Sequence, residues 1–132
     1  MIALDTNLLV RYIVQDHPEQ AAIATNLIET RLSEDEPGFV AHLVLAELVW
    51  VLRGYGYGRE QIAETLTRLL CAVELSVEQV ELAWSALRAY AKGPADFADY
   101  LIGFRARSVG CSTVMTFDRK AARSGLHELP VP

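Results

Sequence analysis

The sequence has few of the features that mark exported or membrane-bound proteins. It contains only two cysteines, Cys71 and Cys111, too few for a disulfide framework. Because both have apolar neighbours, we expect them to be reduced thiols in the core of a cytoplasmic protein. The longest apolar run, residues 39–52, is interrupted by His42 and Glu47 and is shorter than the roughly 20 residues that cross a bilayer. The chain also starts without a basic leader, so we expect neither export nor membrane insertion.

Repeats, low-complexity segments and linker-like stretches are missing as well. The 132 residues have a mass of 14.6 kDa, and we expect a single domain that spans residues 1–132. Apolar residues make up 52% of the chain and charged residues 22%, which excludes a disordered or fibrous protein. A chain of this length buries roughly two-thirds of its unfolded surface, enough for a core without covalent staples.

The net charge of −5 argues at first against a nucleic-acid partner, because phosphate binding favours a basic surface. The charge is unevenly distributed, however. Residues 96–123 hold five basic and three acidic side chains, a net charge of +2, which leaves −7 for the rest of the chain. An acidic protein still accepts a polyanion where metal ions mediate the contact.

Short apolar runs alternate with longer segments at helical spacing, which is typical of an α/β domain. Because helical segments separate the strands, we expect a mostly parallel sheet. The helix at 43–53 is so apolar that we expect it to be buried on most sides. Strands are expected near residues 2–4, 39–40, 73–75, 113–116 and 128–129, and helices near residues 6–13, 18–32, 43–53, 59–71, 77–92, 96–108 and 119–123.

Acidic residues fall at the ends of these elements. Asp5 follows the first strand and Asp118 the fourth, and ligands of parallel sheets bind at the carboxyl ends of strands. Asp96 and Asp99 open a helix and share one face of it. Glu47 lies within an apolar helix, where a charge is costly unless it faces a polar site. Carboxylates that converge repel one another, so they favour a hard cation such as Mg²⁺ or Mn²⁺.

Each acid also has a purely structural interpretation. Asp5 and Asp96 suit N-caps, Asp99 suits the first turn of its helix, and Asp118 suits a turn.

For Glu47 the structural alternative is a buried salt bridge, to Arg11 or to Arg53. An imidazole at His42 is more typical of a hydrogen-bonded structural group than of a metal ligand.

Four segments carry a family resemblance, and they occur in the order of the family's motifs. They are IALDTN at 2–7, LAELVWVL at 45–52, ADFADYLI at 95–102 and TFDR at 116–119. Together they span nearly the whole chain. On these motifs the sequence resembles the PIN-domain ribonucleases, and specifically the VapC toxins of bacterial VapBC toxin–antitoxin pairs.

The resemblance implies a three-layer α/β/α fold and Mg²⁺- or Mn²⁺-dependent hydrolysis of RNA phosphodiester bonds. It implies four catalytic acids, of which Asp5 and Asp99 are the direct metal ligands. The other two, Glu47 and Asp118, are ligands or orient water. We assign the third motif's metal ligand to Asp99 because an apolar pair follows it, as in the family, and we leave Asp96 as a cap or outer acid.

Further residues are assigned supporting or binding roles. Thr6, Asn7 and Thr116 are candidates to hold a carboxylate or a phosphate, with caps and strand ends as the alternative. The basic side chains after the third motif either follow the RNA backbone or form a solvated helix face; they are Arg105, Arg107, Arg119, Lys120 and Arg123. The histidines lack a spacing that would place two imidazoles across a scissile bond, which disfavours a metal-free ribonuclease.

The resemblance also implies partners: an RNA substrate, a VapB-like antitoxin and a second copy of the chain. Leu43, Trp50 and the turn at 54–58 are candidates for an antitoxin groove. Core packing is the alternative for Leu43 and Trp50, and loop punctuation for the turn.

Two other functions are weighed against a ribonuclease. A phosphatase with an aspartyl nucleophile requires a second acid two residues after the first, where this chain has Asn7. A PIN-fold binding module without catalysis is disfavoured because all four acidic positions are filled.

Overall fold

The computed structural model describes residues 1–132. The chain forms two compact units, Met1–Val80 and Glu81–Pro132, which we describe in turn. A single domain over residues 1–132 stays a prediction from the sequence. None of the helices has the length and apolar character needed to cross a membrane.

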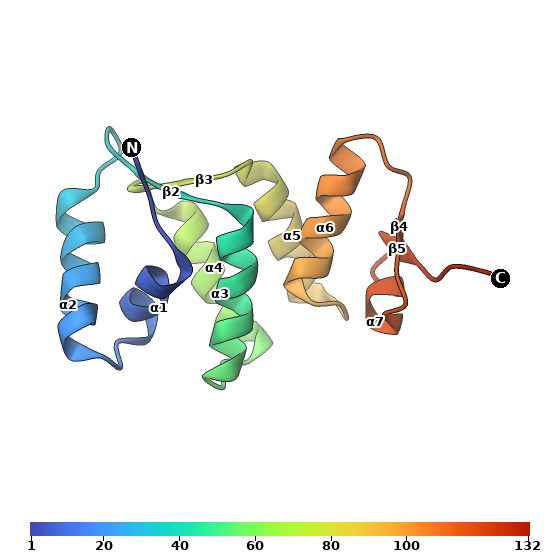
Figure 1. The fold of residues 1–132 in the computed structure, drawn as a ribbon, viewed down its shortest axis with the longest axis horizontal. Coiled ribbons are helices and arrows are strands. Elements are labelled where there is room, and N and C mark those ends of the chain that lie inside the picture. Colours follow the sequence, from blue (N-terminus) through green and yellow to red (C-terminus); the bar gives the residue numbers. More distant parts are fainter. The chain divides into compact units, whose positions relative to one another are not determined.

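The first unit alternates strands and helices (Figure 1). Its helices are α1 (Thr6–Val14), α2 (Pro18–Asn26), the short π-helix η1 (Leu27–Arg31), α3 (His42–Gly54) and α4 (Arg59–Cys71). Its strands are β1 (Ile2–Ala3), β2 (Gly38–Val40) and β3 (Leu75–Val77).

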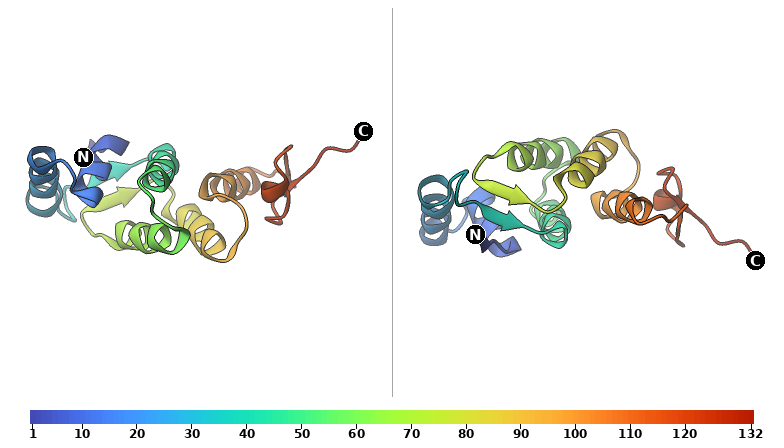
Figure 2. Two further views of the ribbon diagram at one scale, coloured as in Figure 1. Left: turned by 90° about the horizontal axis from the view of Figure 1, so that it is seen from below. Right: turned by 90° about the horizontal axis from the view of Figure 1, so that it is seen from above.

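These three strands form one parallel sheet in the order β1-β2-β3. Gly38 pairs with Ile2 on one side and with Leu75 on the other. Figure 2 shows α4 on one face of this sheet and α1 on the other, so the first unit has three layers. The predicted α/β class, the parallel pairing and the α/β/α layering are confirmed.

The second unit contains α5 (Val80–Lys92), α6 (Phe97–Ser108) and α7 (Arg119–Ala122). Helix α5 begins at Val80, which is the last residue of the first unit. The strands of the second unit, β4 (Val114–Met115) and β5 (His127–Glu128), form a separate parallel pair. Tyr90 and Phe97 pack edge to face in its core, with ring centroids 5.9 Å apart. The strands thus form a three-stranded and a two-stranded sheet.

The boundaries of most elements follow from local sequence signals. His17 precedes Pro18, which begins α2 at the position where a missing N–H costs nothing. Two elements begin later than predicted. β3 begins at Leu75, because the Leu75 N–H donates to the Ala72 carbonyl and closes a turn over residues 72–75. The helix predicted from residue 77 begins at Val80, because β3 extends to Val77.

Two sequence-based expectations about burial are wrong. Helix α3 is not buried on most sides: Leu45 and Leu48 are buried, whereas Leu43 is 72% and Trp50 75% exposed. The buried positions have the spacing of a single helix face. The apolar composition of the helix alone did not reveal this. Cys71 and Cys111 are both free thiols, but both are exposed rather than in the core.

The two faces of α3 provide a matched test of this packing. Leu45→Ala should lower the free energy of unfolding by about 2–5 kcal/mol, because it leaves a cavity at a fully buried position. Leu43→Ala, two residues away on the exposed side, should change it by less than about 0.5 kcal/mol. Urea denaturation of both variants measures the difference. Equal losses would contradict the assignment of the two faces.

Candidate functional site

In the first unit, the start of α1 brings Asp5 and Glu47 to the same cavity. Asp5 is the N-cap of α1, and its Oδ1 accepts the Leu8 N–H at 3.1 Å. The next residue, Thr6, donates from Oγ1 to Glu47 Oε1 at 2.9 Å. Because Glu47 belongs to α3, this bond links the first and second acidic motifs directly.

These groups open onto a cavity of about 310 Å³. Its lining residues are Asp5, Thr6, Asn7, Glu47, Trp50 and Val51. Glu47 is exposed, so a buried salt bridge does not explain it. Of its suggested partners, Arg11 instead donates from Nε to Gln20 at 2.6 Å and lies 3.8 Å from Asp16. Glu47 therefore lies at the solvent-exposed wall of the cavity that Asp5 also lines.

In the second unit, Asp99 lies in the first turn of α6. Its Oδ2 accepts the Asp96 N–H at 3.3 Å, so the two acids of the third motif are bonded to each other. One turn further along the same face is Gly103, where a Cβ atom would come within 2.7 Å of Leu126. Glycine therefore allows the segment before β5 to approach the face of α6 that carries Asp99.

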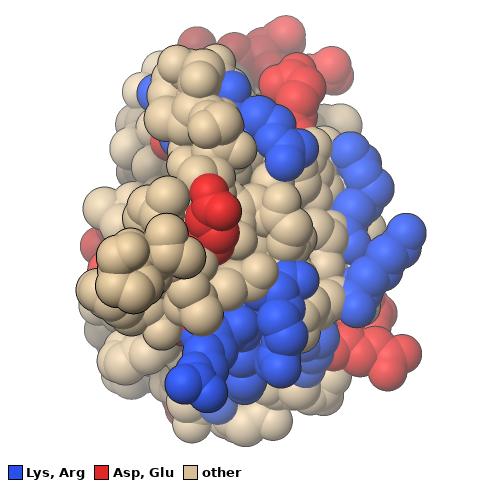
Figure 3. Space-filling model, turned by 90° about the vertical axis from the view of Figure 1, so that its right-hand side faces the viewer, with Lys and Arg blue, Asp and Glu red and all other residues tan.

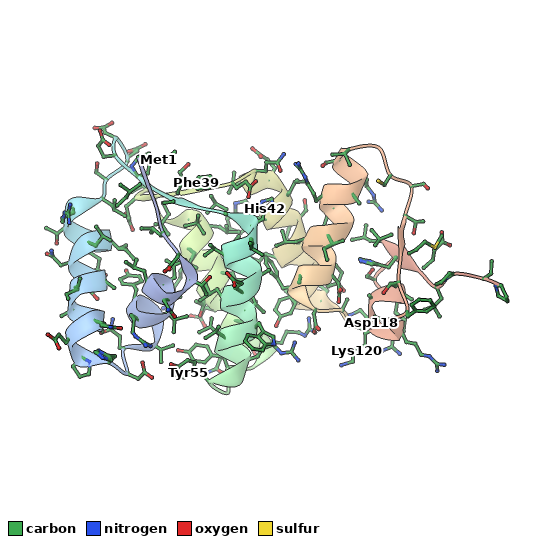
Figure 4. The ribbon with its side chains drawn as sticks, viewed as in Figure 1. Met1, Phe39, His42, Tyr55, Asp118 and Lys120 are labelled. Carbon is green, nitrogen blue, oxygen red and sulfur yellow. The ribbon has the colours of Figure 1, made fainter.

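Asp118 is fixed in the same unit by a compact turn (Figure 4). It is the N-cap of α7, and its Oδ1 accepts N–H bonds from Lys120 at 2.8 Å and from Ala121 at 3.1 Å. Its own N–H donates to Thr116 Oγ1 at 2.9 Å. The fourth acid is exposed, but its backbone and carboxylate are both held in place.

The electrostatics of the second unit single out Asp99. Partial burial raises the pKa of Asp99, and the negative charges of Asp118 and Asp96 raise it further. The Asp96 N–H and the nearby His127 lower the same pKa without cancelling the rise. An ionised Asp99 is thus held in an unfavourable environment, as expected for a carboxylate that accepts a cation.

Sequence reasoning missed His127, which it judged only by its spacing from the other histidines. His127 is 6% exposed, pairs with Val114 across the β4–β5 ladder and has its Nδ1 3.1 Å from Ser124 Oγ. Its charge interaction with Asp99 places it near the acids. A predicted pairing of the last two strands was the signal that would have found it.

The structure therefore groups Asp5 with Glu47 through Thr6, and Asp99 with Asp96 and Asp118. Neither unit contains a group of three or more His, Cys, Asp or Glu side chains placed to hold a metal ion. The side-chain atoms that could bind a metal here are carboxylate or hydroxyl oxygens, which suit Mg²⁺ or Mn²⁺ and not a softer metal. That all four acids contribute to a single metal site stays a prediction.

The basic side chains of the second unit are exposed. Arg105 and Arg107 lie in the last turn of α6, and Arg119 and Lys120 lie in α7. The Arg107 guanidinium lies 5.9 Å from the centre of the Phe104 ring. Figure 3 shows a molecular face on which Lys and Arg side chains gather in patches, a surface suited to a polyanion.

Predictions about three further residues, His42, Leu43 and Trp50, have different outcomes. The structural interpretation of His42 is confirmed: its N–H donates to Glu78 at 2.8 Å, and its Nε2 lies 3.3 Å from the Gln79 carbonyl. Core packing is wrong for Leu43 and Trp50, whose exposure was given above.

A larger cavity, about 480 Å³, lies in the first unit away from the predicted site residues. Within it the Tyr12 hydroxyl donates to Glu29 Oε2 at 2.7 Å. Burial, then this bond and the charge of Glu29, raise the pKa of Tyr12 to about 12. The cavity contains none of the four acids, so volume alone does not identify the site.

Comparison with known proteins agrees with these motifs. A model of the PIN domain matches residues 2–125, and the chain belongs to this family. It is also 29% identical over 126 residues to a VapC ribonuclease of Aquifex aeolicus (strain VF5). The aligned region covers 95% of this chain and 93% of the relative. The resemblance to VapC-type PIN domains is thereby confirmed.

The environment of Asp99 leads to a prediction about stability. Asp99→Asn should raise the melting temperature at neutral pH, because it removes a partly buried charge and its repulsion from Asp118 while keeping an oxygen for the Asp96 N–H. A raised folded pKa means that the native state binds the proton more tightly, so wild-type stability falls as pH rises through that value. The advantage of the variant should vanish below the ordinary pKa of 3.8.

Thermal melts of both proteins between pH 3 and pH 8 measure this difference. The control is Asp35→Asn, at an exposed aspartate of the first unit, which should show no such trend. A variant that is less stable than the wild type at neutral pH would rule out strain at Asp99.

Proposed function

We propose that this protein is an endoribonuclease that hydrolyses RNA phosphodiester bonds with Mg²⁺ or Mn²⁺, as the toxin of a type II toxin–antitoxin pair. The observation that carries the proposal is the match of the PIN domain to residues 2–125 in a chain that fills all four acidic positions of the motifs. The similarity to a VapC ribonuclease, along nearly the full length of both chains, supports the reaction class.

We assign the catalytic roles to Asp5, Glu47, Asp99 and Asp118. Asp5 and Asp99 are the direct metal ligands. One oxygen of each already accepts a backbone N–H, which fixes the orientation of the carboxylate before a cation arrives. Glu47 and Asp118 hold and orient the attacking water. Asp96 and Thr116 support Asp99 and Asp118 through the backbone bonds described above.

When bound, the divalent ion lowers the pKa of water and offsets the negative charge that builds on the phosphate oxygens. The protein supplies position: Thr6 fixes the rotamer of Glu47, and Asn7 lines the same cavity as a donor for a phosphate oxygen. The chain needs no nucleophilic side chain for this reaction, so we expect no covalent intermediate.

Exposed charged and apolar side chains support the assignment of substrate and partners. Arg105, Arg107, Arg119 and Lys120 are exposed cations that compensate RNA phosphates beside the acids of the second unit. The apolar side chains exposed on α3, Leu43 and Trp50, suit a protein partner, which we assign as a VapB-like antitoxin. A homodimer in the cytoplasm is part of the same proposal.

Cleavage of RNA by the purified protein tests the central claim. Chelation should abolish cleavage and added Mn²⁺ or Mg²⁺ should restore it. Asp5→Asn and Asp99→Asn should each reduce the rate by about 100-fold or more, since each removes a charge from the metal ligands. Asp35→Asn, purified in the same way, should retain wild-type activity.

Two results would overturn the proposal. Equal activity in all variants would assign the cleavage to a contaminant. Absence of cleavage in wild-type protein with either metal, together with tight partner binding, would favour a PIN-fold binding module.

The hydrogen bond between Thr6 and Glu47 makes a separate prediction. Thr6→Val keeps the shape of the side chain but removes the hydroxyl, so Glu47 loses its only bond across the two motifs. We expect a 10- to 100-fold loss of metal-dependent cleavage, which is typical of partners that orient site carboxylates. Thr6→Ser should restore most of it. Thr25→Val, at a threonine of α2 outside the site, is the matched control, and an unchanged rate for Thr6→Val would show that Glu47 needs no such support.

A further inference from the structure

Phe117 is the most exposed large apolar side chain in the protein, at 89% of its surface. Burial of a phenylalanine is worth roughly 1.5–3 kcal/mol, so folding alone gives no reason for an aromatic ring in water. A single exposed apolar residue is not informative by itself. Its neighbours make this one informative.

The backbone on both sides of Phe117 is fixed. The Thr116 N–H donates to the Glu128 carbonyl at 3.1 Å, which ties the residue before the ring to β5. Thr116 Oγ1 accepts the Asp118 N–H at 2.9 Å, a bond that spans Phe117 itself. The Asp118 carboxylate then caps α7. The ring is therefore presented to solvent at the apex of a short turn that is held at both ends.

The charges around this ring fit a nucleic acid better than a protein surface. Asp118, one of the four proposed catalytic acids, follows Phe117 directly, with the two Cα atoms about 3.8 Å apart. Arg119 and Lys120 come next and are exposed. An apolar protein partner would have to desolvate these three charges. A nucleotide suits the ring and the two cations, since its base has a flat apolar face and its phosphate is anionic.

We propose that Phe117 is the stacking platform for one unpaired nucleobase of the RNA, next to the phosphate that is cleaved. This inference rests on the proposed ribonuclease function and makes Phe117 a specificity-determining residue for it. Because every base has a π-face, stacking selects an unpaired nucleotide rather than a particular base. The preferred substrate is then single-stranded at this position, and a continuous duplex is a poor one.

Binding of a short fluorescent single-stranded RNA, measured by anisotropy with the inactive Asp5→Asn protein, tests the proposal apart from cleavage. Adding Phe117→Leu should weaken binding roughly 10-fold, whereas Phe117→Tyr and Phe117→Trp should retain it, because they keep an aromatic face. Tyr55→Leu, at an exposed aromatic residue of the first unit, is the matched control and should have no effect.

A scan of the same RNA with one abasic nucleotide at a time locates the contact. We expect one position at which the missing base weakens binding about as much as Phe117→Leu does, and at which the two changes together cost no more than either alone. In cleavage assays with otherwise wild-type protein, Phe117→Leu should raise KM more than it lowers kcat.

The outcomes separate this inference from the proposed function. Metal-dependent cleavage by wild-type protein combined with unchanged RNA binding and KM for Phe117→Leu overturns the stacking role alone. Loss of self-association by Phe117→Leu with intact RNA binding overturns it too, and assigns the ring to a contact between copies. If the wild-type protein neither cleaves nor binds RNA, both proposals are wrong.

Discussion

The negative charge of each candidate acid has to be stabilised by groups of the protein, and the local structure around these acids depends on that constraint. The protein meets it in the same way at each candidate acid that follows a strand or opens a helix. Asp5 and Asp118 are N-caps, and Asp99 accepts a backbone N–H in the first turn of α6. A helix start offers unpaired N–H groups and a positive dipole end, both of which favour a negative charge. The cap and the candidate catalytic acid are thus one residue, and the structural and functional interpretations of Asp5 and Asp118 do not compete.

An acid that caps a helix still has a carboxylate oxygen available for a ligand. A cap bond occupies one carboxylate oxygen and fixes its rotamer, which lowers the entropy lost when a cation binds. Glu47 lacks a helix start, because it lies in the middle of α3, and it is oriented instead by the hydroxyl of Thr6. The order of the first motif, an acid followed by a hydroxyl residue, therefore has a physical reason: Asp5 starts α1 and Thr6 reaches across to α3.

Much of the fold was predictable because the signals are local. Gly-Pro breaks, caps and the alternation of short and long apolar segments gave the order of the elements, and helix-separated strands predicted parallel pairing, as found in β1-β2-β3. The errors concern burial. Hydrophobic residues on α3 were placed in the core because composition does not tell which face of a helix meets the sheet, and the exposed Leu43 and Trp50 show the result. Cys71 was misjudged for the same reason.

The sequence motifs name the members of the candidate site, which stay a prediction, and they say less about its surroundings. The motifs favour Asp99 over Asp96 by the apolar pair that follows it, and in the structure the backbone N–H of Asp96 holds the carboxylate of Asp99. The position of His127 was missed, because it depends on the pairing of β5 with β4, which had to be predicted first, and on the close approach of Leu126 to Gly103. Contacts of that kind join residues far apart in sequence, which spacing along the chain does not encode.

The raised pKa of Asp99 shows that its surroundings disfavour the ionised carboxylate. A fold that keeps Asp99 ionised at neutral pH does so against burial and the charges of Asp118 and Asp96. His127, almost fully buried and near Asp99, supplies partial compensation from within the protein. Because the compensation is incomplete, the pKa of Asp99 stays raised, and under the proposed function a cation bound at Asp99 would offset the remaining cost of its charge.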